Sequence, residues 1–93
     1  MPQEKDKIPP VSMDSLFFML ATSALVNLGS IPNPVDQKIS RNLDLAKYNI
    51  DLMLVLKEKT RGNLTAAEAK LLDELLHDLR LKYASETSRP VKQ

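Results

Sequence analysis

Three acidic residues, Asp44, Asp51 and Glu58, recur at seven-residue spacing and would share one face of a helix. Carboxylates grouped in this way can bind a metal ion or transfer protons. Lys47 lies among them, and no histidine is close to them in the sequence. Because charged side chains are mostly exposed in folded proteins, we expect a solvated helix face here, with no metal-binding or catalytic function.

His77 is the only histidine of the chain, with Asp73 one helical turn before it and Asp78 beside it. A histidine oriented by a carboxylate can act as a base or as a metal ligand. It lies opposite a leucine stripe, without a serine or cysteine nucleophile nearby, so we expect a surface histidine. The sequence therefore predicts no catalytic residue, no metal ligand and no cofactor-binding residue.

Basic residues cluster at Lys57, Lys59 and Arg61, where they favour the negative end of a helix dipole. The formal net charge is +1, from 13 basic and 12 acidic residues. Nucleic-acid-binding proteins usually carry a strongly basic face, and this balance gives none. Gly29 and Gly62 are the only glycines, too few and too far apart for a phosphate-binding loop. These patterns favour a protein that is not an enzyme and does not bind nucleic acid.

The chain is 93 residues long, which is enough for one small domain. A domain of this size buries only about 60–65% of its unfolded surface and is marginally stable as a monomer. Disulfides, metal sites and oligomerisation are the usual remedies. The chain contains no cysteine, so the sequence favours a homo-oligomer, either a dimer or a higher assembly.

The most distinctive segment is a first helix, predicted at about residues 13–28. No charged residue occurs between Asp14 and Asp36, and Leu16 to Leu28 is apolar on nearly every side. Such a helix needs neighbours on all its faces, and one leucine stripe of another helix cannot cover it. We therefore expect the helix to form the oligomer interface, through Phe17, Phe18, Ala21, Ala24 and Leu25.

Two further helices are predicted at about residues 43–61 and 66–84, which makes the fold an all-α, three-helix domain. The second has two apolar faces, one of them formed by Leu45, Tyr48, Leu52, Val55 and Leu56. Thr65 and Glu68 form a capping box that starts the third helix. The short turn at Gly62 makes these two helices an antiparallel hairpin. Residues 1–11 and 85–93 are predicted to be flexible tails around a domain of residues 12–84.

Several motifs together resemble a known family. They are Leu20–Val26, the loop Leu28-Gly29 followed by Ile31-Pro32-Asn33-Pro34, and Glu58–Thr65 with its Gly-Asn-Leu-Thr turn. The chain resembles, over about residues 13–83, a small bacterial family catalogued as a domain of unknown function. The resemblance implies a bacterial, helical protein and brings no functional residues with it.

The sequence thus predicts a helical interaction or structural module that binds a second copy of itself, with an unidentified protein partner as a further option. The alternatives are a peripheral membrane protein that lays residues 13–28 in the lipid interface, and a binder of a small apolar ligand between helices. Interfacial helices usually carry lysine or arginine on a polar face, which this segment lacks. Residues 1–14 do not resemble a signal peptide, and Leu16–Leu28 is shorter than the roughly 20 residues that span a bilayer. We therefore expect a cytoplasmic location.

Overall fold

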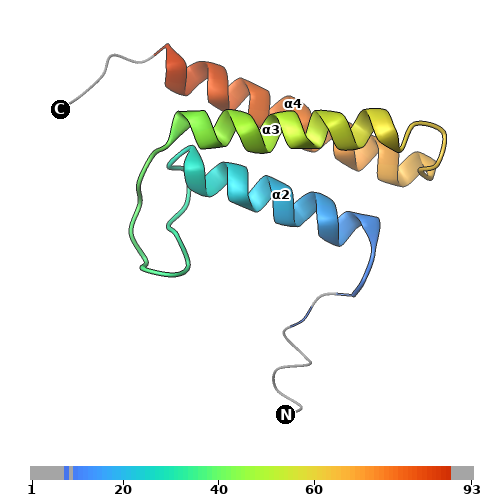
Figure 1. Ribbon diagram of the computed structural model, residues 1–93, viewed down its shortest axis with the longest axis horizontal. Coiled ribbons are helices and arrows are strands. Elements are labelled where there is room, and N and C mark those ends of the chain that lie inside the picture. Colours follow the sequence, from blue (N-terminus) through green and yellow to red (C-terminus); the bar gives the residue numbers. More distant parts are fainter. Residues whose placement is uncertain (1–7, 9, 89–93) are drawn as a thin grey trace.

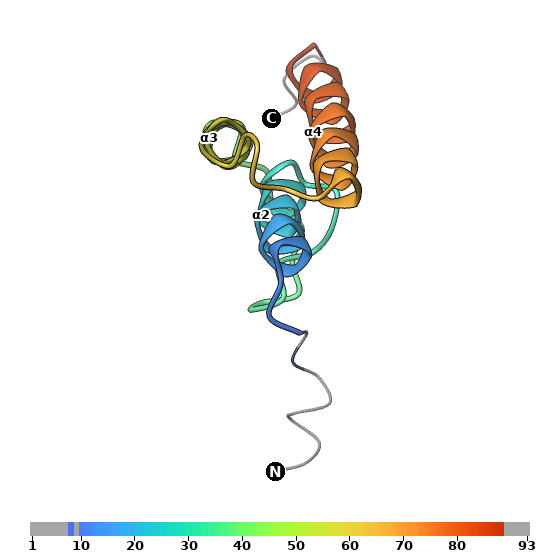
Figure 2. The ribbon, with the colours of Figure 1, turned by 90° about the vertical axis from the view of Figure 1, so that its right-hand side faces the viewer.

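Three helices make up the fold in the computed structural model, which describes residue 8 and residues 10–88. Helix α2 spans Met13–Asn27, α3 spans Leu43–Lys59 and α4 spans Ala66–Thr87 (Figure 1). Consecutive helices run antiparallel, and in the view of Figure 2 they occupy the corners of a triangle, with α2 against both α3 and α4. The all-α, three-helix fold with its α3–α4 hairpin, predicted from the sequence, is confirmed.

Local capping chemistry sets the start of each helix. The side chains of Ser12 and Asn42 accept hydrogen bonds from the backbone N–H groups of Ser15 and Leu45, each at 3.1 Å. At α4 the Thr65 hydroxyl accepts from the Glu68 N–H at 3.1 Å, and the Glu68 carboxylate accepts from the Thr65 N–H at 2.9 Å. These side chains satisfy N–H groups that have no partner within the helix. The predicted capping box is thus confirmed.

Glycines end two of the helices in the left-handed conformation. Gly29 has φ +78°, and the Ser30 N–H donates to the Leu25 carbonyl at 3.0 Å, as in a Schellman motif. Gly62 has φ +83° in the turn between α3 and α4. Glycine suits both positions because it adopts positive φ without the steric cost that a Cβ brings.

One apolar stripe from each helix forms the core. Each of these ten side chains is at most 5% exposed, and no polar or charged residue among the described ones is buried. The stripes consist of Phe17, Ala21, Ala24 and Leu28 on α2, Ala46, Ile50 and Met53 on α3, and Leu72, Leu76 and Leu79 on α4. The alanines allow the helices to approach closely.

The third helix is longer than predicted. It continues to Thr87, so residues 85–87 belong to α4 and not to a C-terminal tail. No glycine or proline occurs between the start of α4 and Pro90. In the last turn of the helix, Glu86 also forms an ion pair with Arg41 at 2.6 Å. Residues 89–93, and most of the predicted N-terminal tail, lie outside the described part of the chain. Ile8, Pro10 and Val11, which are described, lie outside the helices and are exposed.

The long connection between α2 and α3 projects from the helices at the end where α2 stops (Figure 1). Its end is held by the Asn42 N–H, which donates to the Asn27 carbonyl at 2.8 Å. Ile31 is half-buried, whereas Val35 is 91% exposed and does not anchor the loop on the core. The Asn33 side chain accepts from the Val35 N–H at 2.8 Å and turns the chain outward there.

Candidate functional site: an apolar belt on α2 and α3

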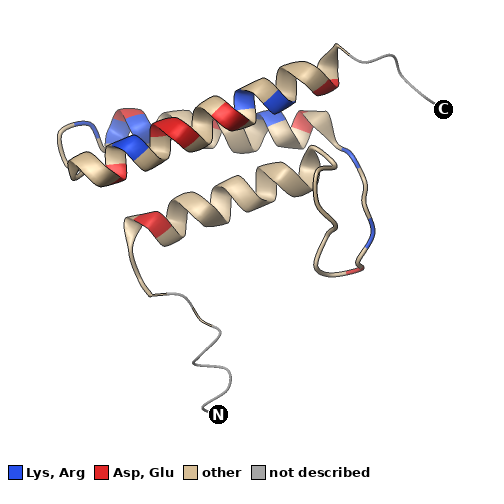
Figure 3. Ribbon diagram, turned by 180° about the vertical axis from the view of Figure 1, so that it is seen from behind, with Lys and Arg blue, Asp and Glu red and all other residues tan. Residues whose placement is uncertain are grey.

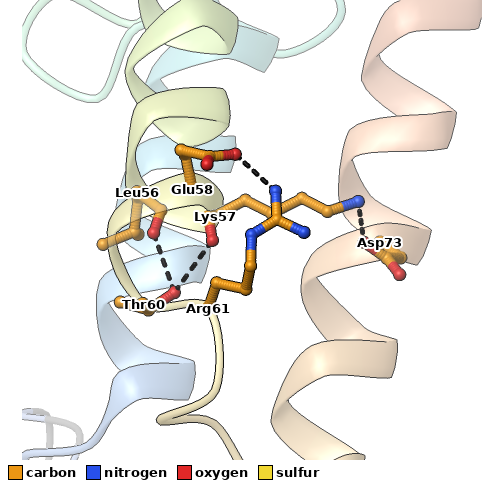
Figure 4. Close-up of polar contacts among 6 residues, drawn as sticks. All are labelled: Leu56, Lys57, Glu58, Thr60, Arg61 and Asp73. Atoms are coloured by element: carbon orange, nitrogen blue, oxygen red, sulfur yellow. Dashed lines mark hydrogen bonds and ion pairs between the residues drawn. The ribbon is translucent and has the colours of Figure 1, made fainter.

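Two members of the acidic row of α3 form separate ion pairs, whereas Asp44 forms no hydrogen bond or ion pair with any residue that the structure describes. Asp51 accepts a hydrogen bond from Lys47 at 2.8 Å, and Glu58 pairs with Arg61 (Figure 4). The hydrogen bond and the charge of Asp51 raise the pKa of Lys47 above its ordinary value, so this lysine stays cationic at neutral pH. Among the described residues, no three histidine, cysteine or acidic side chains lie together as they would around a metal ion.

His77 lies on the exposed side of α4, beside a hollow of about 280 Å³ between α3 and α4. The carboxylate that the sequence places one turn before it, Asp73, instead forms an ion pair with Lys57 of α3 at 2.7 Å (Figure 4). The side chain of Asp78 pairs with Lys82 at 3.3 Å. Both neighbouring carboxylates are therefore engaged with lysines.

The basic group at the end of α3 is spread around the helix. Lys57 reaches across to α4, and Arg61 turns back to Glu58 (Figure 4). Lys59 is two positions from Lys57, so it projects from the other side of α3. These cations do not form one basic face.

Three of the five predicted interface residues lie inside the subunit. Phe17 and Ala24 are 0% exposed and Ala21 is 3% exposed, because the α3–α4 hairpin covers this stripe of α2. Leu25 is half-buried and packs against the same core. Only Phe18, at 49% exposure, presents most of its ring outward. The predicted interface is therefore corrected: Phe17, Ala21 and Ala24 hold the subunit together and are not available to a partner.

A different set of large apolar side chains is exposed on the outer sides of α2 and α3. We call it the apolar belt, and its members are each between 36% and 60% exposed. Figure 3 shows that α2 carries no charged residue after Asp14, in contrast to α3 and α4. The belt consists of Phe18, Met19, Leu45, Tyr48, Leu52 and Val55.

The belt runs across the line of contact between α2 and α3. The Asn27 side chain donates a hydrogen bond to the Asn49 side chain at 2.7 Å, so the face of α3 with Asn49 meets α2. Leu45 and Leu52 are four residues before and three residues after Asn49, on that same face. Leu16 and Leu20 of α2 lie eleven and seven residues before Asn27, which places them on the side of α2 that faces α3. Apolar side chains of both helices therefore flank the line of contact between α2 and α3.

A shallow hollow of about 600 Å³ lies on the outer face of α2 within this region. Its apolar lining comes from Val11, Leu16, Phe18 and Met19, and its polar lining from hydroxyl groups such as that of Thr22. No charged residue lines it. Its chemistry suits an apolar surface or an apolar molecule.

The sequence contained the signal for the α3 part of the belt. The second apolar face predicted for this helix contained residues 45, 48, 52, 55 and 56; the first four are exposed, whereas Leu56 is half-buried and packs against the core. The interface residues that the sequence predicted by number all lie on the first helix.

Comparison with known families places the chain. The model of a family described as "Domain of unknown function (DUF1844)" matches residues 10–85. The chain belongs to this family. The match covers α2, α3, all but the last two residues of α4, and the loop with the Ile-Pro-Asn-Pro motif, so the resemblance to a domain of unknown function noted from the sequence is confirmed. No curated protein and no solved structure matches this member of the family.

The length and hydropathy of the helices bear on the membrane alternative. None of the described helices is both long enough and apolar enough to cross a bilayer.

Proposed function

We propose that this chain is a non-enzymatic interaction module that binds a second copy of itself through the apolar belt. The observation that carries the proposal is the exposure of six large apolar side chains on the outer sides of α2 and α3. Soluble monomers rarely expose contiguous apolar patches larger than a few hundred Å². Half-exposed side chains of this size present on the order of several hundred Å² together, close to the ~800 Å² that each partner buries in a standard interface.

The size of the subunit's own core supports the same proposal. Among the residues that the structure describes, only ten apolar side chains are buried, and three of them are alanines. Small domains often gain the missing stability from association. Covering the belt would remove apolar area from water at about 25 cal/mol per Å², before the cost of association is subtracted.

The polar residues support the non-enzymatic part of the proposal. Of the carboxylates considered for a reaction, Asp51, Glu58 and Asp73 are each paired with a lysine or arginine on the surface. Among the described residues, Asp44 belongs to no group of acidic or histidine side chains that could hold a metal ion. Such pairs keep a helix surface soluble and contribute little else.

A membrane surface is the second candidate, supported by the loop after α2. Val35 is 91% exposed and Ile39 is 64% exposed there, on either side of Lys38. Apolar side chains beside a cation are the pattern of an interfacial contact. A small apolar ligand in the hollow of α2 is the third candidate, supported by the uncharged lining of that hollow.

The test compares the mass of the protein in solution with that of two matched variants, measured by light scattering. Val55→Asp places a charge in the belt, and Leu81→Asp places the same charge on α4 at a side chain of similar exposure, 58% against 55%. We expect a dimer or higher oligomer for the wild type and for Leu81→Asp, and a folded monomer for Val55→Asp.

Mixing the same preparation with vesicles that contain anionic lipid tests the second candidate, binding to a membrane surface. A wild-type protein that is monomeric at all concentrations and co-sediments with vesicles would contradict self-association and support the membrane candidate. A monomer that stays in the supernatant would contradict both.

A further inference from the structure

The two ends of the belt on α3 carry opposite charges. Asp44 lies in the first turn and Lys59 in the last turn of the helix. Within the described part of the chain, the side chains of both are without a hydrogen bond or an ion pair, whereas the lysines at 47 and 57 are paired. The two charges are separated by 15 residues, which is about 22 Å along a helix.

We propose that two copies of the chain pair their α3 helices in an antiparallel manner about a two-fold axis near Leu52. This inference rests on the proposed self-association and specifies its geometry. A two-fold axis perpendicular to α3 between residues 51 and 52 places each residue opposite the one equally far from that midpoint. Tyr48 then lies opposite Val55 of the second copy, and Leu52 packs close to the axis.

The charges select this orientation. In the antiparallel pair, Asp44 of each copy lies opposite Lys59 of the other, so both unpaired charges gain a partner. A parallel pair would place each charge opposite an identical one, which is unfavourable. Like-charge contacts at an interface oppose the wrong arrangement more strongly than opposite charges favour the right one.

The position of α2 agrees with the same axis. Because α2 lies beside α3, the rotation that pairs the two α3 helices also brings the outer faces of the two α2 helices to the same side of the interface. The outer face of α2 next to α3 carries Met19, and α2 has no charged residue after Asp14, so the approach of these faces meets no charge repulsion.

A charge-exchange experiment tests this geometry, with dimer dissociation measured by sedimentation equilibrium. Lys59→Glu and Asp44→Lys each convert two attractive contacts of the symmetric dimer into two repulsive ones. Exposed ion pairs are weak individually, but two changed contacts should raise the dissociation constant roughly tenfold in each single variant. The double variant restores both pairs and should return to the wild-type value.

The matched control is Arg80→Glu, which makes the same change of charge on α4. Arg80 is exposed and lines the hollows between α3 and α4 together with Leu54, away from the belt. Its dissociation constant should equal that of the wild type. Circular dichroism confirms that each variant is folded, and if Asp44→Lys does not fold, the comparison of Lys59→Glu with Arg80→Glu decides.

The outcomes separate the two proposals. A wild-type dimer in which the double variant is as weak as the single ones, or in which Lys59→Glu behaves like Arg80→Glu, would overturn the antiparallel α3 pairing and leave self-association standing. A wild type that is monomeric throughout would overturn both.

Discussion

Helix α2 and the α3–α4 hairpin cover the same core from opposite sides, but their outer surfaces differ. The hairpin carries ion pairs within and between its helices, including Lys47–Asp51, Lys57–Asp73 and Lys82–Asp78. The outer face of α2 has only apolar, hydroxyl and amide side chains after Asp14. Exposed ion pairs add little stability. Their main consequence here is that the outer surface of the hairpin is hydrophilic. The contrast is the reason that we propose α2 and the adjoining edge of α3 as the side of contact.

The largest expected effect on the free energy of unfolding is a difference between a residue on the inner face of α2 and its neighbour on the outer face. Phe17 and Phe18 are adjacent in sequence, but Phe17 is 0% exposed and Phe18 is 49% exposed. Phe17→Ala should lower the free energy of unfolding by about 3–5 kcal/mol, because it leaves a cavity among all three helices. Phe18→Ala should cost the folded subunit about 1 kcal/mol or less. Chemical denaturation measures both, and equal losses would contradict the assignment of the two faces.

A substitution in the turn between α3 and α4 should have an intermediate effect on stability. Gly62 has φ +83°, and a Cβ added there meets no atom within 4 Å. Gly62→Val should therefore cost about 1–2 kcal/mol through backbone strain alone. Gly62→Asn is the matched control, since asparagine tolerates the left-handed region better than other residues with a side chain. A thermal melt of Gly62→Val that coincides with the wild type would show that the turn does not need positive φ.

The smallest effect concerns the start of α4. Thr65→Ala removes the hydroxyl that accepts from the Glu68 N–H and should cost about 1 kcal/mol. Thr65→Ser retains the hydroxyl and should keep nearly all of the stability. Because this cap is local to the hairpin, neither variant should change the mass of the protein in solution. A loss of association in Thr65→Ala alone would mean that the hairpin and the belt are not independent.

Most of the fold could be predicted because its signals are local. Local signals mark the helix ends: the capping box of Thr65 and Glu68 starts α4, and the glycines at 29 and 62 follow the ends of α2 and α3. The end of α4 was missed because its support is not local. Arg41 and Glu86 are 45 residues apart in the sequence, and only the packing of the helices brings them to 2.6 Å.

The candidate interface was harder to predict for a related reason. A helix that is apolar on all sides gives no indication of which side the rest of the subunit covers, so Phe17 and Phe18 look equivalent in the sequence. The packing of α2 against both helices of the hairpin decides between them. On α3 the polar arc orients the helix, so its second apolar face, with Leu52 and Val55, could be recognised in advance as surplus to the core.

The claim that the belt is a contact between copies can be tested most directly by cross-linking at single cysteines. The chain contains no cysteine, so Leu52→Cys and Leu81→Cys each provide one thiol. A disulfide requires Cα atoms about 4.4–6.8 Å apart, which the proposed two-fold axis supplies only near Leu52. Random collision would favour Leu81, which is 58% exposed against 36% for Leu52. Under mild oxidation we predict a rapid covalent dimer for Leu52→Cys and slow or no dimer for Leu81→Cys; equal rates, or faster cross-linking at Leu81→Cys, would contradict the account.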